Sequence, residues 1–235
     1  MTSRSASWGT YIYTSISLRF YDAYVLGFNM RYIWGCATYT ILLPLFCENF
    51  SKRHLDIGVA TGYFPSIAIE RSREQDARHI TLMDLNKNSL HAAEKRIKGD
   101  HSDLDVDVQC VYGDVLGPLP DALKEQKFDS ISLFNLFHCV PGTPERKAES
   151  FATLAQCLSD DGVLVGNTVL GKGYMGWSPL TWYTMFLFNY FFRSFTNWED
   201  NPEAFEAGLR REFEDVQTWI VGSMFLFRAR KPRRN

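Results

Sequence analysis

The chain has 235 residues, 46% of them hydrophobic and 22% charged, and a formal net charge of -2. This length and composition predict a single domain with a large core, spanning residues 1–235. The charge balance argues against a nucleic-acid partner, because contact with phosphates normally needs a basic surface. None of the five cysteines lies in a CxxC pair, so we predict no metal site, no disulfide framework and a cytoplasmic protein.

The first 50 residues are rich in aromatic side chains. They hold 12 of the 35 aromatic residues and lack the basic and apolar pattern of a secretion signal. A parallel sheet does not need this aromatic surface for its own core, so we expect residues 1–50 to form a helical lid.

The stretch HLDIGVATGYFP (residues 54–65) begins the regular part of the chain. A short buried strand at 54–58 precedes small residues at Gly58, Ala60 and Gly62, which allow a sharp turn into a helix near 62–74. Buried strands that alternate with helices predict a parallel sheet covered on both faces. Further strands are expected at 80–85, 106–114, 128–136 and 162–170, and helices from Asn86 or Asn88 and at 143–159.

Residues 173–192 carry no charge and are about long enough to cross a bilayer. Pro179, Asn189 and the even spread of aromatic residues weaken a membrane helix, so we expect a soluble pocket wall and no membrane partner. An amphipathic helix is expected within 197–215.

The chain closes with two strands, 216–221 and 224–230, joined by Gly222-Ser223. So short a connection permits only an antiparallel hairpin. The predicted fold is α/β: a Rossmann-like, doubly wound, mostly parallel seven-stranded sheet with an antiparallel last strand, an N-terminal helical lid and an aromatic insertion before the hairpin.

Ligands of open parallel sheets bind outside the carboxyl ends of the strands. Asp56, Asp84 and Asp114 belong to that edge, and three carboxylates disfavour a phosphate and suit a cationic or donor-rich ligand. The loop lacks the second and third glycines of a nicotinamide fingerprint, and no Gly-Lys-Ser/Thr triplet follows it.

The run LDIGVATGY, the acidic end of the second strand and the Gly113-Asp114 pair resemble the class I S-adenosylmethionine-dependent methyltransferases. The resemblance covers residues 54–230 in element order, with Ala60 in place of the middle glycine of hDxGxGxG. The segment 21–36 is similar to small natural-product methyltransferases. The resemblance implies S-adenosylmethionine as cofactor and S-adenosylhomocysteine as product. Within the single domain we expect a lid (1–50), a cofactor-binding core (51–171), a substrate-covering insertion (172–215) and a closing hairpin (216–230).

The family pattern also implies a role for each polar residue of the edge. Asp84 would bind both ribose hydroxyls, Asp114 the adenine amino group and Asp56 the methionine ammonium. Tyr21 could bind the cofactor's carboxylate, although a packing role is equally good. The predicted cofactor contacts are Tyr21, Asp56, Gly58, Ala60, Gly62, Asp84, Leu85, Gly113, Asp114, Val115 and Asn135.

A second aromatic concentration, 11 residues within 174–198, follows the fifth strand. With the lid it predicts an apolar pocket for a small acceptor beside the cofactor, and a thicker hydrophobic core is an equally good interpretation. The predicted acceptor contacts are Tyr24, Trp34, Trp177, Trp182 and Phe186.

His138 follows the fourth strand and titrates near neutral pH, so it is the candidate general base, with packing as the alternative. The other histidines, His54 among them, are expected to be solvated. The predicted function is methyl transfer to a small, largely apolar secondary metabolite, on an oxygen. Two alternatives remain: a methyltransferase-fold pericyclase that uses the cofactor without methyl transfer, and a binding protein with a degenerate site. The oligomeric state is not predicted.

Overall fold

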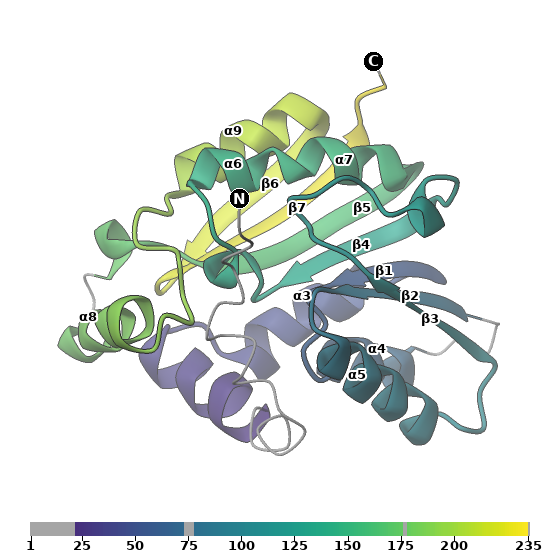
Figure 1. Ribbon diagram of the computed structural model, residues 1–235, viewed down its shortest axis with the longest axis horizontal. Helices are drawn as coiled ribbons and strands as arrows, with labels where there is room; N and C mark the ends of the chain where they lie inside the picture. Colours follow the sequence, from purple (N-terminus) through teal and green to yellow (C-terminus); the bar gives the residue numbers. More distant parts are fainter. Residues whose placement is uncertain (1–21, 73–77, 176–177, 235) are drawn as a thin grey trace, which may run out of the picture.

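The computed structural model describes residues 22–72, 78–175 and 178–234 (Figure 1). Tyr21 and Trp177, two of the predicted ligand contacts, lie outside these ranges. In the described part of the chain, one twisted sheet is covered by helices on both faces.

The sheet has seven strands in the order β3-β2-β1-β4-β5-β7-β6. β1, β2, β3, β4 and β5 pair in parallel, whereas β7 runs antiparallel to both of its neighbours. This confirms the predicted doubly wound sheet and its closing hairpin. The strands are β1 (Arg53–Ile57), β2 (Arg78–Asp84), β3 (Val106–Tyr112), β4 (Phe128–Phe134), β5 (Leu158–Val169), β6 (Phe213–Val221) and β7 (Met224–Pro232).

Helices cover the sheet in two layers. α6, α7 and α9 lie above it in Figure 1, and α3, α4 and α5 lie below. The α-helices are α3 (Leu43–Glu48), α4 (Tyr63–Arg71), α5 (Lys87–Asp100), α6 (Pro144–Ala148), α7 (Ser150–Cys157), α8 (Pro179–Phe186) and α9 (Pro202–Glu212). Wider π-helical turns form η1 (Asp22–Ile33), η2 (Thr38–Leu42) and η6 (Leu187–Phe191), and short 3₁₀ turns form η3 (Asp121–Leu123), η4 (Phe137–Cys139) and η5 (Lys172–Tyr174).

Two predicted helices are shorter than expected. The helix predicted at 143–159 is divided into α6 and α7, and Leu158 already belongs to β5, because it pairs with Phe128 at the start of β4. In the segment 197–215 the helix begins only at Pro202, where the Asn201 side chain accepts a hydrogen bond from the backbone N–H of Ala204. Sheet pairing therefore ends the first helix, and a side-chain cap sets the start of the second.

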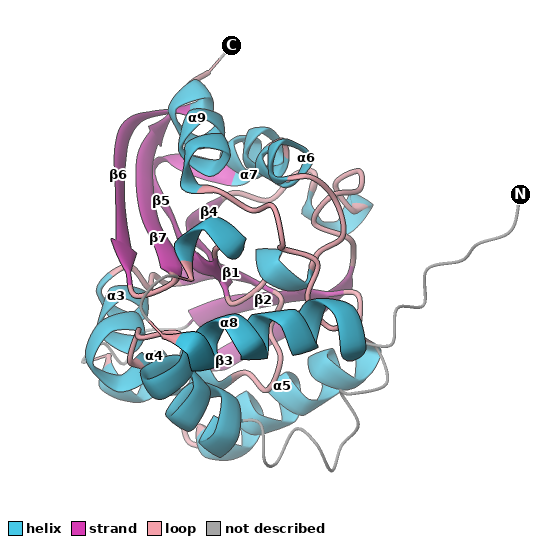
Figure 2. Cartoon of the chain, turned by 90° about the vertical axis from the view of Figure 1, so that its left-hand side faces the viewer, coloured by secondary structure: helices cyan, strands magenta, loops and turns pink. Residues whose placement is uncertain are grey.

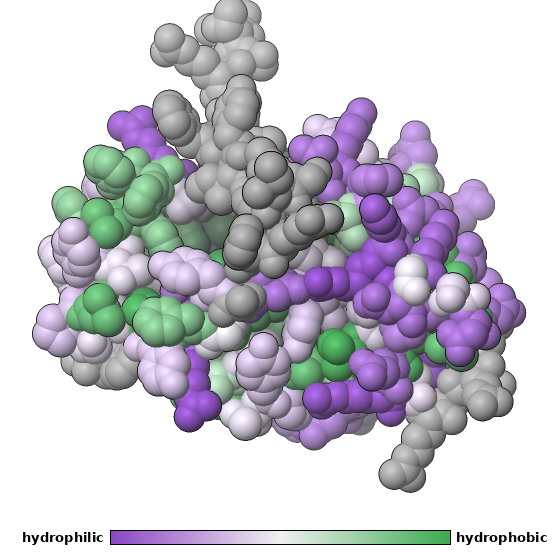
Figure 3. Space-filling view, turned by 90° about the horizontal axis from the view of Figure 1, so that it is seen from below, coloured by the Kyte–Doolittle hydropathy of each residue, from purple (hydrophilic) through white to green (hydrophobic). Residues whose placement is uncertain are grey.

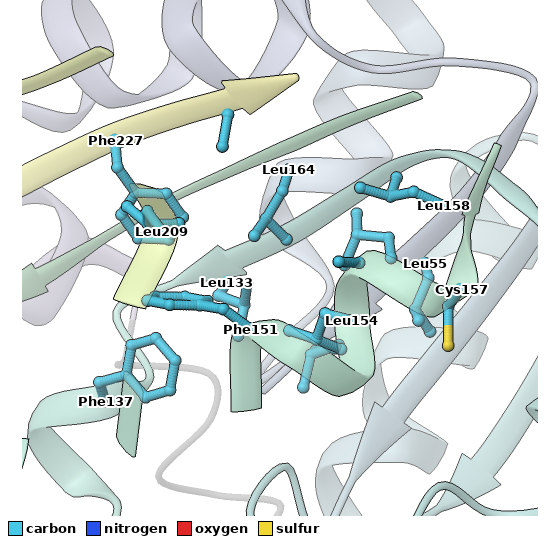
Figure 4. Close-up of a cluster of buried hydrophobic side chains, with 14 of the residues drawn as sticks. Leu55, Leu133, Phe137, Phe151, Leu154, Cys157, Leu158, Leu164, Leu209 and Phe227 are labelled. Atoms are coloured by element: carbon cyan, nitrogen blue, oxygen red, sulfur yellow. The ribbon is translucent and has the colours of Figure 1, made fainter. Parts of the chain in front are cut away.

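A cluster of apolar side chains fills the space between the sheet and the upper helices (Figure 4). Phe151 of α7 and Phe137 of η4 are fully buried, and their rings meet edge to face with 5.6 Å between centroids. This contact anchors the segment that follows β4, which carries His138.

The charge-free segment 173–192 forms η5, α8 and η6, and no helix in the described residues is long and apolar enough to cross a membrane. The Thr181 hydroxyl on α8 donates a hydrogen bond to the Ile33 carbonyl at the end of η1, with 2.6 Å between the oxygens. The insertion and the N-terminal helix are thereby joined, and in Figure 2 α8 lies in front of the strands.

Candidate active site

The loop between β1 and α4 turns through three left-handed residues. Gly58, Ala60 and Gly62 have φ angles of 77°, 45° and 69°. A Cβ atom on Gly62 would lie 2.8 Å from the Ala93 Cα atom, so only glycine lets α4 start this close to α5. Ala60 has a side chain and still adopts a left-handed φ angle, which is strained for any residue other than glycine. The backbone therefore makes the turn that the family motif implies.

Asp56 lies on β1 directly before this loop and is 5% exposed. The Ser132 hydroxyl on β4 donates to its Oδ1 atom across 2.5 Å. The Asp56 pKa is raised to about 7, chiefly by burial and to a lesser degree by the nearby Asp84 charge, while the hydrogen bond from Ser132 opposes the rise. A buried carboxylate of this kind favours a cationic ligand group beside it.

Asp84 ends β2, one strand away. Its Oδ1 atom accepts a hydrogen bond of 2.7 Å from the backbone N–H of Asn86. Burial raises the Asp84 pKa to about 6, and hydrogen bonds from backbone N–H groups, including those of Val59 and Ala60, oppose the rise. The carboxylate thus faces the glycine loop as well as the edge of the sheet.

The other predicted cofactor residues lie after β2, β3 and β4. Asn135 has a φ of 55°, and its side-chain oxygen accepts a hydrogen bond of 2.8 Å from Asn167. Asp114 is exposed and closes its own loop through the N–H of Leu116. Leu85 is exposed and Gly113 and Val115 are half-buried, so their contacts with a ligand remain predictions.

A group of hydrogen bonds with one ion pair connects the N-terminal helix to the glycine loop, and it was not predicted from the sequence. The Thr61 hydroxyl donates to Asp22 Oδ1 at 2.8 Å, and Arg96 of α5 pairs with Asp22 Oδ2 at 2.6 Å. Arg96 also donates to the Thr61 oxygen at 3.0 Å. Asp22, Thr61 and Arg96 hold the start of η1 against the loop that the cofactor is expected to contact.

His138 lies in η4 and is 6% exposed, with its ring 4.3 Å from that of Phe195. Its Nδ1 atom lies 3.4 Å from the Val169 backbone nitrogen, which donates to it. This contact favours the neutral tautomer with its proton on Nε2. Burial, and to a lesser degree the charge of Lys147, lower the His138 pKa to about 3. Its role as a base stays a prediction.

The prediction that His54 is solvated is wrong. His54 is 1% exposed, and its ring lies 5.3 and 4.7 Å from the rings of Phe46 and Phe50, which stack on each other. Both ring nitrogens lie within hydrogen-bonding distance of serine hydroxyls on β4. A histidine at a strand start gives no local sign of burial, because the burial comes from the neighbouring strand.

The aromatic candidates divide into two groups. Tyr24, Trp182 and Phe186 are 58%, 49% and 40% exposed, whereas Trp34 is 2% exposed and packs against Phe195 in the core. Trp34 therefore belongs to an apolar cluster of the core, whereas the other three side chains reach the surface. A hollow of about 570 Å³ lies at the opposite edge of the sheet, beside Phe50 and Lys52. It is remote from the carboxyl ends of the strands and is not the expected cofactor site.

Comparison with known proteins decides the family. A methyltransferase domain model matches residues 55–164. The O-methyltransferase NEC2 of Pyricularia oryzae is 42% identical, in an alignment covering 99% of this chain and 96% of that protein. The chain belongs to the S-adenosylmethionine-dependent methyltransferases. Methyltransferase verB of Penicillium polonicum is a further relative, 36% identical over 94% of this chain and 97% of its own length.

Solved structures show the same fold. The structure of PigF with SAH aligns with a TM-score of 0.65 at 16% identity, covering 97% of this chain and 63% of that one. The DhpI–SAH complex gives a TM-score of 0.63 at 15% identity and covers 97% of both chains. The Rossmann-like architecture of this methyltransferase is thereby confirmed.

The residues of the edge fit the cofactor of this family. S-adenosylmethionine carries an ammonium group, a ribose diol and a charged sulfur. Asp56 is buried with a raised pKa and suits a cation, and Asp84 lies at the end of β2 beside the backbone N–H groups of Val59 and Ala60. The donor and acceptor chemistry of the site therefore matches the cofactor.

Proposed function

We propose that this methyltransferase transfers the methyl group to a hydroxyl oxygen of a small, largely apolar secondary metabolite. Similarity to an O-methyltransferase along almost the whole chain is the observation that carries the proposal. A second relative, an O-methyltransferase of Aspergillus niger, is 46% identical over 77% of this chain and 91% of that protein.

Two exposed aromatic rows support an apolar acceptor. Trp182, Phe186 and Tyr190 follow one another at four-residue spacing, with 5.8 and 5.1 Å between successive ring centroids. A second row, Tyr24, Phe28 and Tyr32, runs along η1 with ring distances of 6.2 and 5.3 Å. Figure 3, which views the molecule from below Figure 1, shows apolar and weakly polar residues gathered toward its left side. Such rows offer stacking surface to a flat, apolar acceptor.

The proposed roles follow the geometry of the edge. Asp56 would hold the ammonium group, Asp84 the ribose hydroxyls, and the backbone of Gly58 to Gly62 would lie against the methionine portion. When bound, S-adenosylmethionine supplies a methyl group on a positively charged sulfur that leaves readily. The chain's main contribution is to hold the acceptor oxygen in line with that bond and to exclude water.

The first experiment tests acceptor and reaction together. The purified protein is incubated with S-adenosylmethionine and a panel of hydroxylated aromatic compounds, and products are followed by mass spectrometry. Methylated product and S-adenosylhomocysteine should form in equal amounts. A rearranged product without S-adenosylhomocysteine would support the pericyclase alternative instead.

We expect Trp182→Ala or Phe186→Ala to raise the KM of the acceptor by roughly fivefold or more, as loss of an aromatic contact worth over 1 kcal/mol does. Cofactor affinity should change little. Ile220→Ala is the matched control, because Ile220 is 46% exposed on β6 at the far edge of the sheet. Unchanged KM values in both aromatic variants would contradict the proposed acceptor face.

His138→Ala tests the proposed base. General-base catalysis typically contributes about 10²- to 10⁴-fold, and efficiency is highest when the pKa is near the working pH. With a pKa of about 3, His138 should contribute at or below the low end of that range. We therefore expect kcat to fall by up to about 10²-fold with unchanged cofactor affinity. A kcat equal to that of the wild type across the pH range would leave His138 a packing role.

A further inference from the structure

A line of hydrogen bonds runs along the neighbouring strands β1 and β4 toward the glycine loop. The register of β1 against β4 places His54 opposite Ser130 and Asp56 opposite Ser132. The four side chains are between 0% and 5% exposed. Because alternate residues of a strand point to the same face, both polar pairs lie on one face of the sheet.

The distances connect these groups into one chain. The Ser51 backbone N–H donates to Ser130 Oγ at 3.0 Å, and Ser130 Oγ lies 2.7 Å from His54 Nδ1. His54 Nε2 lies 3.0 Å from Ser132 Oγ, which donates to Asp56 Oδ1. We call Ser51, Ser130, His54, Ser132 and Asp56 the His54 chain.

The ends of the His54 chain set the direction of its hydrogen bonds. The Ser51 N–H can only donate, so Ser130 accepts there and is free to donate its own hydrogen to His54 Nδ1. A neutral imidazole then carries its proton on Nε2 and donates it to Ser132. Ser132 in turn donates to Asp56. This assignment gives every hydrogen in the chain an acceptor, and burial keeps His54 neutral by lowering its pKa to about 3.

We propose that His54 is a positioning residue for the methyl donor: through Ser132 it keeps a hydrogen-bond donor on Asp56 Oδ1 and leaves Oδ2 to the ammonium group of S-adenosylmethionine. The inference rests on the proposed role of Asp56. An ionised carboxylate with one oxygen fixed by a donor is already oriented for a cation at the other.

The surroundings of Asp56 make this donor important. The charged group acting on it within the described residues is Asp84 of β2, which disfavours ionisation. On the helix side the neighbouring surface is aromatic, since Phe46 contacts His54, Phe64 and Phe134. Ser132 is the side chain whose hydrogen bond favours the carboxylate form. Its loss should move the Asp56 pKa upward.

The test measures proton release when S-adenosylmethionine binds. If the ammonium binds only ionised Asp56, binding below the Asp56 pKa must release a proton in addition to any that Asp84 releases. Affinity must then rise with pH until both carboxylates are ionised, and the Asp56 step is the one that the variants below should move. Calorimetry in buffers of different ionisation enthalpy, from pH 5.5 to 8.5, gives both quantities for the full chain.

Ser132→Ala should move the midpoint of proton release to higher pH and weaken binding at pH 7 by about tenfold, the effect of one hydrogen bond to a charged group. His54→Phe keeps the aromatic packing with Phe46 and Phe50 and should shift the midpoint less, in the same direction. Thr81→Val is the matched control, because it removes another buried hydroxyl of the sheet, on β2. Its midpoint should equal that of the wild type.

Nitrogen-detected NMR of His54 provides a readout that does not depend on binding. A neutral ring protonated on Nε2 from pH 5.5 to 8.5 is expected. Unshifted midpoints in both variants, or a ring protonated on Nδ1, would overturn the positioning role. A separate variant tests the proposed role of Asp56 itself. If Asp56→Asn leaves affinity and proton release unchanged, the ammonium group does not bind at Asp56.

Discussion

Asp84→Ala should weaken the binding of S-adenosylmethionine by roughly 10- to 100-fold. The expectation takes a total of about 1.5–3 kcal/mol for the hydrogen bonds to this charged acceptor that the variant loses. In the structure the carboxylate lies at the end of β2 beside the glycine loop, the place from which a ribose diol can be reached. Calorimetric titration of the wild type and the variant measures the difference directly.

Asp84 also has a structural role, so the Asp84→Ala variant needs controls. Its carboxylate also accepts the backbone N–H of Asn86, and Asp84→Asn separates charge from shape while keeping one acceptor oxygen. Asp107→Ala removes the same charge from β3 at an exposed position and should leave affinity unchanged. Equal affinities of the Asp84→Ala protein and the wild type would refute the cofactor placement, provided that both melt at similar temperatures.

The sheet and its functional edge could be predicted because their signals are local. The strand at 54–58, the small-residue turn and the aspartates at strand ends are all visible within short windows of sequence. The resemblance to methyltransferases also depends on such windows. Even the departure at Ala60 left the turn intact, as its φ of 45° shows.

The missed features all join residues far apart in the chain. Asp22 meets Arg96 across 74 positions, and His54 meets Ser132 across 78. Such pairs depend on strand register and on how helices dock, and neither is encoded by a local pattern. The two aromatic segments show the same limit of sequence analysis. Their composition identified both segments, but only tertiary packing determines that Trp34 is buried and Trp182 exposed.

A buried ion pair supports the segment after β4. Lys147 of α6 and Asp200 have side chains that are 0% and 1% exposed, with 2.7 Å between Nζ and Oδ2. Lys147 Nζ also donates to the Thr196 carbonyl at 3.2 Å. The Thr196 N–H donates to the His138 carbonyl at 2.8 Å, so the ion pair fixes the backbone on which His138 lies.

Asp200→Ala should lower the free energy of unfolding by about 3–5 kcal/mol, because it leaves an uncompensated buried charge on Lys147. Burial already lowers the Lys147 pKa and raises that of Asp200 to about 6, so desolvation outweighs the attraction between the two groups. It follows that Lys147→Met combined with Asp200→Leu should recover most of the lost stability. Denaturant unfolding followed by fluorescence measures all three proteins.

The pH dependence distinguishes a stranded charge from a simple packing loss. In the Asp200→Ala protein the native state favours neutral Lys147, whereas the unfolded state keeps the Lys147 proton. Because the unfolded state then binds more protons, the free energy of unfolding must rise with pH. We expect the deficit to shrink between pH 7 and 9, and the double variant to show no such trend. Arg210→Ala, which breaks an exposed pair with Glu206, should cost no more than about 1 kcal/mol at any of these pH values. The prediction fails if Asp200→Ala loses the same free energy of unfolding at every pH and no more than the double variant does. Side-chain packing, and not charge, would then hold this segment in place.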